Sequence, residues 1–397
     1  MPPGLGFQGQ AQTFSLGELG YIGLALLVAA GVAFLLTPVA IRFAVRAGAI
    51  DMPDEGRRVH RRPIPRGGGL AVATAFVVVG SLFLWFALDR RIYANWPQVT
   101  VPSNSIDPEQ FIALMAGVAL AAIFGFVDDR WQLRARWQLL EQLLLAGIAL
   151  AGGILISTIY NPLAIFGGAP TPALDPALSI LLTVIWIVGM INSINFIDGL
   201  DGLSTGVSLI AALTIGVISL NATVATVEPL VALLCAVLAG SLAGFLPWNF
   251  HPAKVFIGTT GVYAVGFALA VLSILTAAKV AVALLILGVP IIDTFWIIVR
   301  RLSQRKSPFT PDRGHMHHRL LDLGLSHRDA VLVIYGLCAL LAVVSIVLSD
   351  RQAIYAFTVI VLAGGLVLYL ASRRAQEALD ARSYPDDEPD TTDGSAA

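Results

Sequence analysis

Charged residues are scarce in this chain of 397 residues, where Asp, Glu, Lys and Arg together make up 13%. Ordinary soluble domains contain about 25%. Hydrophobic residues make up 57%. A single soluble core could not bury so much apolar surface, so the composition excludes an ordinary soluble domain. It is typical of a membrane protein with several spans.

Cysteine is almost absent as well. The two cysteines, Cys235 and Cys338, both lie in apolar runs, which excludes a disulfide framework and a thiolate metal site. No sustained internal repeat and no soluble domain can be found. We expect membrane lipids around the chain, and no nucleic acid among its partners.

Apolar runs of about 17 to 25 residues are long enough to cross a bilayer as helices. The chain contains eleven such runs, near residues 20–41, 68–88, 110–127, 139–158, 177–195, 204–222, 229–247, 260–277, 280–298, 330–348 and 353–371. We therefore predict an all-α integral membrane fold of about eleven transmembrane helices. We expect three regions: an extracytoplasmic N-terminal segment (1–19), a polytopic domain (20–372) and an acidic cytoplasmic tail without fixed structure (373–397).

The basic residues are distributed unevenly between the two sides of these spans. With the N-terminus outside and the C-terminus in the cytoplasm, all but four of the 25 Lys and Arg residues fall on the cytoplasmic side. This distribution predicts the orientation, because cytoplasmic loops are enriched in Lys and Arg. The same side holds all six histidines: His60, His251, His315, His317, His318 and His327.

Residues 192–202 read N-S-I-N-F-I-D-G-L-D-G and directly follow an apolar run. Two amides and two carboxylates occur there at steps of three residues: Asn192, Asn195, Asp198 and Asp201. On a helix this spacing places side chains on one face, toward a single ligand or ion. Helix capping accounts for one or two of them. We favour a functional site, because desolvating all four is costly.

A second acidic motif, Asp128-Asp129, stands at the end of the third predicted span. Adjacent carboxylates can hold a divalent cation or act as a base toward a phosphate or hydroxyl. The alternative is a solvated helix end, paired with Arg130 or Arg134. For an isolated Asp-Asp pair this alternative is favoured.

Three further loops carry basic or aromatic groups. The first, 51–69, combines His60 and Arg66 with prolines and glycines, and serves either as topogenic charge near lipid headgroups or as a phosphate cradle. The fourth, from Leu246, contains Trp248 and Asn249, which could hold a nucleobase or simply lie at the membrane interface; the interface is favoured. The fifth, 300–319, could bind zinc, but its many Arg residues favour a diphosphate.

Taken together, carboxylates and basic groups converge on one side of the membrane. This combination of side chains suits phosphoryl transfer, in which catalysis depends mainly on positioning and charge neutralisation. The substrates would be a soluble phosphate donor and an acceptor in the bilayer. A secondary transporter is less well supported, because transporters place carboxylates near the midplane between repeated halves.

Several motifs, in order, resemble the polyprenyl-phosphate N-acetylhexosamine-1-phosphate transferase family (glycosyltransferase family 4 type). They are D-x-P-x-x-x-R-x-V-H-x-x-P-x-P-R-x-G-G from residue 51, Asp128-Asp129, N-x-x-N-x-x-D-G-x-D-G-L from residue 192, P-I-I-D-T from residue 290, and S-P-F-x-x-D-R-G-H-x-H-H-R-L-L from residue 307. The resemblance extends over residues 20–372. The histidine motif and the Arg300-Arg301 pair are similar to the branch that uses UDP-N-acetylglucosamine.

The resemblance implies a reaction. A HexNAc-1-phosphate, GlcNAc-1-phosphate above all, would pass from a UDP-sugar to undecaprenyl phosphate, giving undecaprenyl-diphosphate-sugar and UMP. Mg²⁺ would be the cofactor, with Mn²⁺ as the alternative. This is the first membrane step of cell-surface polysaccharide synthesis, such as lipopolysaccharide or teichoic acid, at the cytoplasmic face of the bacterial inner membrane. A monomer and a homodimer both stay open.

The resemblance also implies roles for individual residues. Asp128 and Asp129 would be catalytic and lie near the metal, and Asn195 would be a metal ligand. The substrate-binding residues would be His60, Arg66, Asn192, Asp198, Asp201, Arg300, Arg301, Arg313, His315, His317 and His318.

Two positions depart from the family pattern. Thr259 stands where the family has a magnesium-binding Asp, and Gln138 where a phosphate-contacting Lys is common. A neutral hydroxyl is a far poorer ligand for a hard cation than a carboxylate. Either other carboxylates take over, or the chain is a catalytically altered paralogue that binds polyprenyl phosphate.

Overall fold

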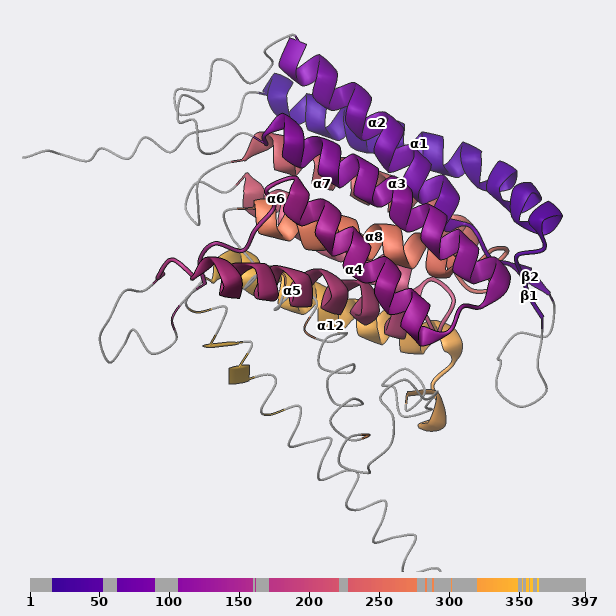
Figure 1. The fold of residues 1–397 in the computed structure, drawn as a ribbon. Coiled ribbons are helices and arrows are strands. Elements are labelled where there is room, and N and C mark those ends of the chain that lie inside the picture. Colours follow the sequence, from indigo (N-terminus) through magenta and orange to yellow (C-terminus); the bar gives the residue numbers. More distant parts are fainter. Residues whose placement is uncertain are drawn as a thin grey trace, which may run out of the picture.

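Figure 1 shows a computed structural model of the protein. It describes residues 16–52, 63–89, 106–159, 171–220, 228–276 and 320–348, with residue 161 and isolated positions after 276, Arg301 among them. Within these ranges the chain forms helices and one short two-stranded ribbon. The helices are α1 (Leu16–Ala47), α2 (Gly69–Asp89), α3 (Pro108–Trp131), α4 (Ala135–Ala151), α5 (Pro176–Ile197), α6 (Leu203–Ser219), α7 (Pro229–Asn249), α8 (Gly258–Leu275) and α12 (His327–Val347).

The predicted all-α membrane fold is confirmed in its main feature. Seven helices of the described part are long and apolar enough to cross a membrane: α1, α2, α3, α5, α7, α8 and α12. Helix α6 is apolar but has 17 residues. The predicted spans near 280–298 and 353–371 fall almost entirely outside the described residues. The count of eleven and the orientation stay predictions.

One predicted boundary is wrong. The span expected at 139–158 corresponds to α4, which begins at Ala135 and ends at Ala151. Two glycines follow, and the second has a φ of 74°, a left-handed conformation that side chains other than glycine adopt at a cost. The apolar residues after this turn therefore continue the hydrophobic pattern without continuing the helix.

Capping residues in the sequence explain where several helices start. Asp175 accepts a hydrogen bond from the backbone of Ala177 at the start of α5, where Pro176 occupies the first helical position. Ser326 accepts one from the backbone of Asp329 at the start of α12. These short polar side chains satisfy amides that have no partner inside the helix.

The helices form two groups that share α2. In one group α3, α4, α5 and α8 contact one another in a ring, and in the other α1 packs on α7, α7 on α6, and α6 on α12. Among the seven membrane-length helices, α7 and α8 are the most enclosed. In each of them 83% of the most apolar 18-residue segment is buried, against 28% in α1. The exposed apolar faces of the outer helices suit contact with lipid tails.

Two glycines of α7 allow α1 to approach closely. A Cβ atom at Gly240 would collide with the backbone of Leu26, and one at Gly244 with the backbone of Ala30. Small residues four apart are a common contact surface between membrane helices, because they let two backbones pack directly.

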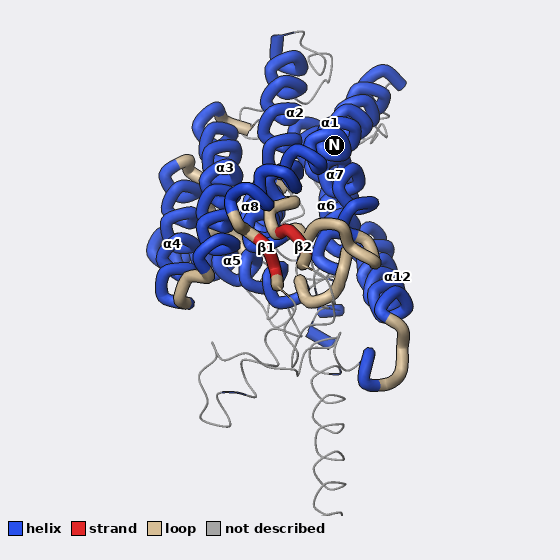
Figure 2. The backbone as a smooth tube through the Cα atoms, turned by 90° about the vertical axis from the view of Figure 1, so that its right-hand side faces the viewer, coloured by secondary structure: helices blue, strands red, loops and turns tan. Residues whose placement is uncertain are grey.

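The two-stranded ribbon is the departure from an all-α fold. Strands β1 (Ile50–Asp51) and β2 (Ile64–Pro65) pair antiparallel, and the ribbon lies at one end of the helix bundle in Figure 1. Figure 2 faces that end and shows α3 and α4 on one side of the ribbon, with α6 and α12 on the other. The backbone amides of Gly68 and Gly69 donate to Phe256 and Ile257. The first and fourth predicted loops therefore meet beside the start of α8.

Candidate functional site

The Asp128-Asp129 pair lies at the end of α3 and faces the N-terminus of α8. Both residues are buried, with exposed fractions of 7% and 5%. The Asp129 carboxylate accepts hydrogen bonds from the backbone amides of Thr259 (2.9 Å) and Thr260 (2.9 Å) and from the Thr260 hydroxyl (2.6 Å). The first amides of a helix are a natural partner for a carboxylate, because they lack acceptors inside the helix. Asp129 therefore joins α3 to α8.

Glycine makes this junction possible on both helices. Gly258 has a φ of 68°, and a Cβ atom there would collide with the Asp129 carboxylate. A Cβ atom at Gly125 would collide with the backbone of Thr259 and Thr260. The close approach of α3 to the start of α8 thus needs glycine at both positions.

The Asp128 carboxylate has a different set of partners. Its Oδ1 atom accepts from the backbone amide of Leu133 (2.9 Å) and from Nε2 of Gln138 (2.9 Å), and its Oδ2 atom accepts from the Thr259 hydroxyl (2.8 Å). The two residues that depart from the family pattern therefore bind the same carboxylate, one on each oxygen. Each carboxylate of the pair thus accepts three hydrogen bonds, and the free acceptor capacity of Asp128 lies mainly on Oδ2.

The motif at residues 192–202 does not lie on a single helical face, so that prediction is wrong. Helix α5 ends at Ile197, so Asn192 and Asn195 belong to it. Asp198 caps the helix, and Asp201 lies in the turn before α6. Gly202 has a φ of 81° and starts α6. The helix therefore ends before the two Asp residues, which gives each carboxylate surroundings of its own.

Asn192 takes part in a polar network among three helices. Its Nδ2 atom donates to Oε1 of Gln142 on α4 (2.6 Å) and to the backbone of Val188 (2.8 Å). Gln142 in turn donates to the hydroxyl of Tyr263 on α8 (3.2 Å). This network holds the end of α5 against α4 and α8. A contact of Asn192 with a substrate stays a prediction.

Asp198 has an enclosed carboxyl group. The Ser204 hydroxyl donates to its Oδ1 atom at 2.6 Å. Burial raises the pKa of Asp198 to about 7, although the Ser204 hydrogen bond acts in the opposite direction. Asp129 and Arg66 both influence this carboxyl electrostatically. Asp198 therefore lies in the same electrostatic environment as the acidic pair and can exchange a proton near neutral pH.

Arg66 is the one basic residue of the first predicted loop's motif that the described ranges include. Its Nη2 atom lies 2.6 Å from Oδ1 of Asp51, and the Arg66 side chain is 27% exposed. Its charge acts on both Asp129 and Asp198. Arg66 thus stands at the carboxylate cluster with part of its surface open, as a phosphate cradle requires.

Several predicted substrate-binding residues lie outside the described residues: His60, Arg300, Arg313, His315, His317 and His318. Arg301 is described and buried, with 6% exposed. The donor-diphosphate role of these residues stays a prediction.

The side chains of the acidic pair, Asn195 and Glu141 offer the kind of oxygen donor that fits the divalent cation that the family resemblance implies. Asn195 is half-buried, and its side chain forms no hydrogen bond with another described residue. Glu141 on α4 has a buried Oε2 atom without a partner in the described part of the chain, and its charge interacts with that of Asp128. Oxygen donors of this kind suit Mg²⁺. Asp129 is the more buried of the pair and takes all three of its hydrogen bonds from the start of α8, so it is a weaker candidate ligand than Asp128.

Glu141 is a residue that the motifs missed. It lies three residues after Gln138, which binds Asp128, so the two share a face of α4. A sequence signal exists, because an acidic residue inside an apolar run marks a functional position.

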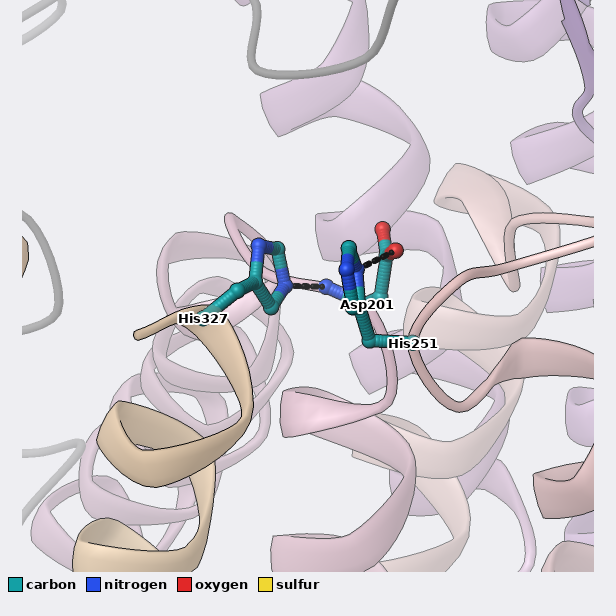
Figure 3. A group of neighbouring side chains, drawn as sticks. All are labelled: Asp201, His251 and His327. Atoms are coloured by element: carbon teal, nitrogen blue, oxygen red, sulfur yellow. Dashed lines mark hydrogen bonds and ion pairs between the residues drawn. The ribbon is translucent and has the colours of Figure 1, made fainter. Parts of the chain in front are cut away.

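Asp201 meets two histidines, as Figure 3 shows. Its Oδ2 atom lies 2.7 Å from Nδ1 of His251, and its backbone amide donates to Nε2 of His327 at 2.9 Å. The two imidazole rings stack at 4.3 Å with an angle of 19°. Motif spacing could not predict this cluster, because His327 stands 126 residues from Asp201.

In the fourth predicted loop, the side-chain amide of Asn249 has a structural role. Asn249 is buried, accepts a hydrogen bond from Thr205 (2.6 Å) and donates to the backbone of Val255 (3.1 Å). The Trp248 ring lies 5.3 Å from Phe34 and 5.1 Å from Nζ of Lys254. Because Asn249 is already engaged, a nucleobase site made of this amide and Trp248 is not favoured.

Similarity to known proteins identifies the family of this chain. The family model described as glycosyl transferase family 4 matches residues 111–277. Decaprenyl-phosphate N-acetylglucosaminephosphotransferase of Mycobacterium tuberculosis is 36% identical over 392 residues, with 92% of each chain covered. The protein of the same name from Mycolicibacterium smegmatis is 35% identical, covering 81% of this chain and 79% of that one. Undecaprenyl-phosphate alpha-N-acetylglucosaminyl 1-phosphate transferase of Thermotoga maritima is 30% identical, covering 72% and 78%. The chain therefore belongs to glycosyl transferase family 4 and is an enzyme of the phosphotransferase type.

Proposed function

We propose that the protein transfers N-acetylglucosamine-1-phosphate, or a closely related HexNAc-1-phosphate, from a UDP-sugar to undecaprenyl phosphate. The products are undecaprenyl-diphosphate-sugar and UMP. The names of the relatives support the sugar phosphate and the polyprenyl phosphate acceptor. The observation that carries the proposal is the buried Asp128-Asp129 pair at the end of a membrane-length helix, with Arg66 and Asp198 in its electrostatic reach.

The two carboxylates have different tasks in this proposal. Asp129 accepts all three of its hydrogen bonds from the start of α8 and fixes the geometry of the site. Asp128 has capacity left on Oδ2, and it orients the lipid phosphate or takes its proton. A phosphate oxygen of the lipid then attacks the β-phosphorus of the donor. The bond from that phosphorus to the bridging oxygen breaks, and UMP leaves with this oxygen.

A two-step route through a phospho-aspartate is the alternative. It would need Asp128 as the nucleophile, which its hydrogen bonds to Thr259 and Gln138 make weaker. Direct attack by the lipid phosphate is simpler, because the carboxylate then has only to hold or move a proton.

Mg²⁺ is part of the proposal, and Asp128, Asn195 and Glu141 are the residues that would hold it. When bound, the cation neutralises the negative charge of the donor phosphates. Asp198 and Asp201 would bind the nucleotide side of the donor, and Arg66 would contribute positive charge. We place this site on the cytoplasmic face of the inner membrane, since the basic residues of the chain predict that orientation.

The experiment is a donor panel. Purified full-length protein in detergent is incubated with undecaprenyl phosphate, Mg²⁺ and one UDP-sugar at a time, and UMP is measured. We expect UMP with UDP-N-acetylglucosamine or a close relative. If no donor releases UMP, the proposed reaction is wrong, and binding of a UDP-sugar without turnover would instead support a catalytically altered paralogue.

A further inference from the structure

Asp201, His251 and His327 come from three separate elements. Asp201 lies in the turn between α5 and α6, His251 follows α7, and His327 is the first residue of α12. One ligand atom from each residue lies within 4.8 Å of the other two. Figure 3 shows both rings directed toward Asp201.

These three side chains are a donor set that suits a transition-metal dication. Two imidazole nitrogens and one carboxylate oxygen are common zinc ligands, whereas Mg²⁺ prefers oxygen alone. All three residues are partly exposed, so an ion from solution could reach them. Both cysteines lie buried in α7 and α12 and do not compete.

We propose that Asp201, His251 and His327 form a binding site for Zn²⁺ or a similar transition-metal ion, separate from the Mg²⁺ site at Asp128. Asp201 also belongs to the proposed donor site, so the test below changes the two histidines and leaves Asp201 in place. Hydrogen bonds in the described part of the chain already join the three residues.

The distances require only a modest rearrangement. Ligands of a tetrahedral zinc ion with bonds of about 2.0 to 2.1 Å lie roughly 3.3 Å apart. The Oδ2 atom of Asp201 and Nδ1 of His251 are already closer, at 2.7 Å, because a proton joins them. Binding would replace that proton. The Nε2 atom of His327 accepts a hydrogen bond from the backbone amide of Asp201 (2.9 Å), and Oδ2 of Asp201 accepts one from that of Ala253 (3.1 Å). Binding would exchange the first of these hydrogen bonds for a bond from Nε2 to the metal.

A metal at this position would connect parts of the chain that are distant in sequence. It would tie the turn at Asp201 to the segment after α7 and to the start of α12. The backbone of this region is already linked: Arg328 donates to the carbonyl of His251 (3.1 Å), and Tyr335 to that of Gly202. We therefore expect the ion to stabilise this end of the helix bundle, since it binds only the folded arrangement.

The test uses full-length protein in detergent, stripped of metal and then titrated with Zn²⁺ against a chromophoric chelator, with Mg²⁺ in excess. The excess Mg²⁺ occupies oxygen-only sites. The variants are His251→Asn and His327→Gln, singly and together. An Asn amide replaces the Nδ1 position and a Gln amide the Nε2 position, so hydrogen bonding is preserved while the imidazole ligand is lost. Tyr335→Phe is the matched control, because it removes a contact to Gly202 without changing a ligand.

We expect the wild type and Tyr335→Phe to bind one more Zn²⁺ than the double variant, and each single variant to bind it at least about tenfold more weakly. Cu²⁺ spectra should show two nitrogen ligands in the wild type and one in each single variant. Zn²⁺ should raise the unfolding temperature of the wild type and leave that of the double variant unchanged. Equal Zn²⁺ binding by the wild type and the double variant would overturn the proposal, since the ion would then lie elsewhere.

Discussion

The hydroxyl of Thr259 donates a hydrogen bond of 2.8 Å to Oδ2 of Asp128. A neutral donor thus stands where the family pattern has a carboxylate, and Gln138, where Lys is common, binds the other oxygen. Compared with the family pattern, the site lacks one negative charge at Thr259 and one positive charge at Gln138. The two departures therefore leave the net charge around Asp128 unchanged. The substitution at Thr259 is therefore part of a rearranged set of contacts to one carboxylate.

Replacing Thr259 by Asp should increase the affinity of the site for Mg²⁺. The new carboxylate would be an oxygen ligand beside Asp128, and the two negative charges would repel each other without a cation. Titration of UMP release with Mg²⁺ measures the change, and thermal unfolding with and without Mg²⁺ measures the repulsion. Thr259→Ser is the control, because it keeps the hydroxyl. An unchanged Mg²⁺ titration would show that this position does not contribute to metal binding.

Glu141→Gln should weaken Mg²⁺ binding at least about tenfold. The Oε2 atom of Glu141 is buried without a partner in the described structure, and the carboxylate interacts with Asp128. A neutral amide of the same size keeps the packing and removes the charge. Mn²⁺ binding followed by electron paramagnetic resonance gives a readout that does not depend on turnover. Equal Mn²⁺ affinity in the wild type and the variant would remove Glu141 from the metal site.

Gly258→Ala should destabilise the junction of α3 and α8. Its Cβ atom would collide with the Asp129 carboxylate, and the backbone has a φ of 68°. We expect a loss of about 1 to 3 kcal/mol and a large loss of activity. Gly189→Ala on α5 is the control, because no atom lies within 4 Å of a Cβ atom there. Similar unfolding temperatures for both variants would contradict the close contact at Asp129.

The contribution of Asp198 to the stability of the protein should fall as the pH rises from the ordinary pKa of Asp toward 7. Its folded pKa of about 7 lies above the ordinary value for Asp, so the unfolded chain releases this proton first. The contribution of Asp198 is therefore present at low pH and is lost as the pH rises toward 7, by at most about 1.4 kcal/mol per pH unit. Unfolding temperatures of the wild type and Asp198→Asn, compared between about pH 5 and pH 8, measure it. A constant difference would contradict the raised pKa.

The helices could be predicted from sequence for two reasons. Apolar runs of membrane length indicate segments that cross the bilayer, and a segment that crosses it must satisfy its own backbone hydrogen bonds, as a helix does. That signal contains no information on where a helix stops inside an apolar run. The turn at Gly152 and Gly153 therefore ended α4 earlier than predicted, and α5 ended at Ile197, within the motif. The ribbon at Ile50 and Ile64 is too short to leave a pattern.

The candidate site was predictable as a set of residues but not as an arrangement. The acidic pair and Arg66 follow from motifs, and the structure places their charges near one another. The partners of each carboxylate depend on helix packing between positions about 130 residues apart, such as Asp129 and Thr260. For the same reason the contact of Asp201 with His327 could not be read from the sequence.

In the proposed function, the Asp128-Asp129 pair performs phosphoryl transfer to a membrane-bound acceptor. The most direct measurement is UMP release from UDP-N-acetylglucosamine and undecaprenyl phosphate by the wild type, Asp128→Asn and Asp129→Asn, each shown by thermal unfolding to be folded. We predict turnover by the wild type and a loss of at least about a hundredfold in both variants. Turnover near the wild-type rate in either variant would exclude that carboxylate from the reaction.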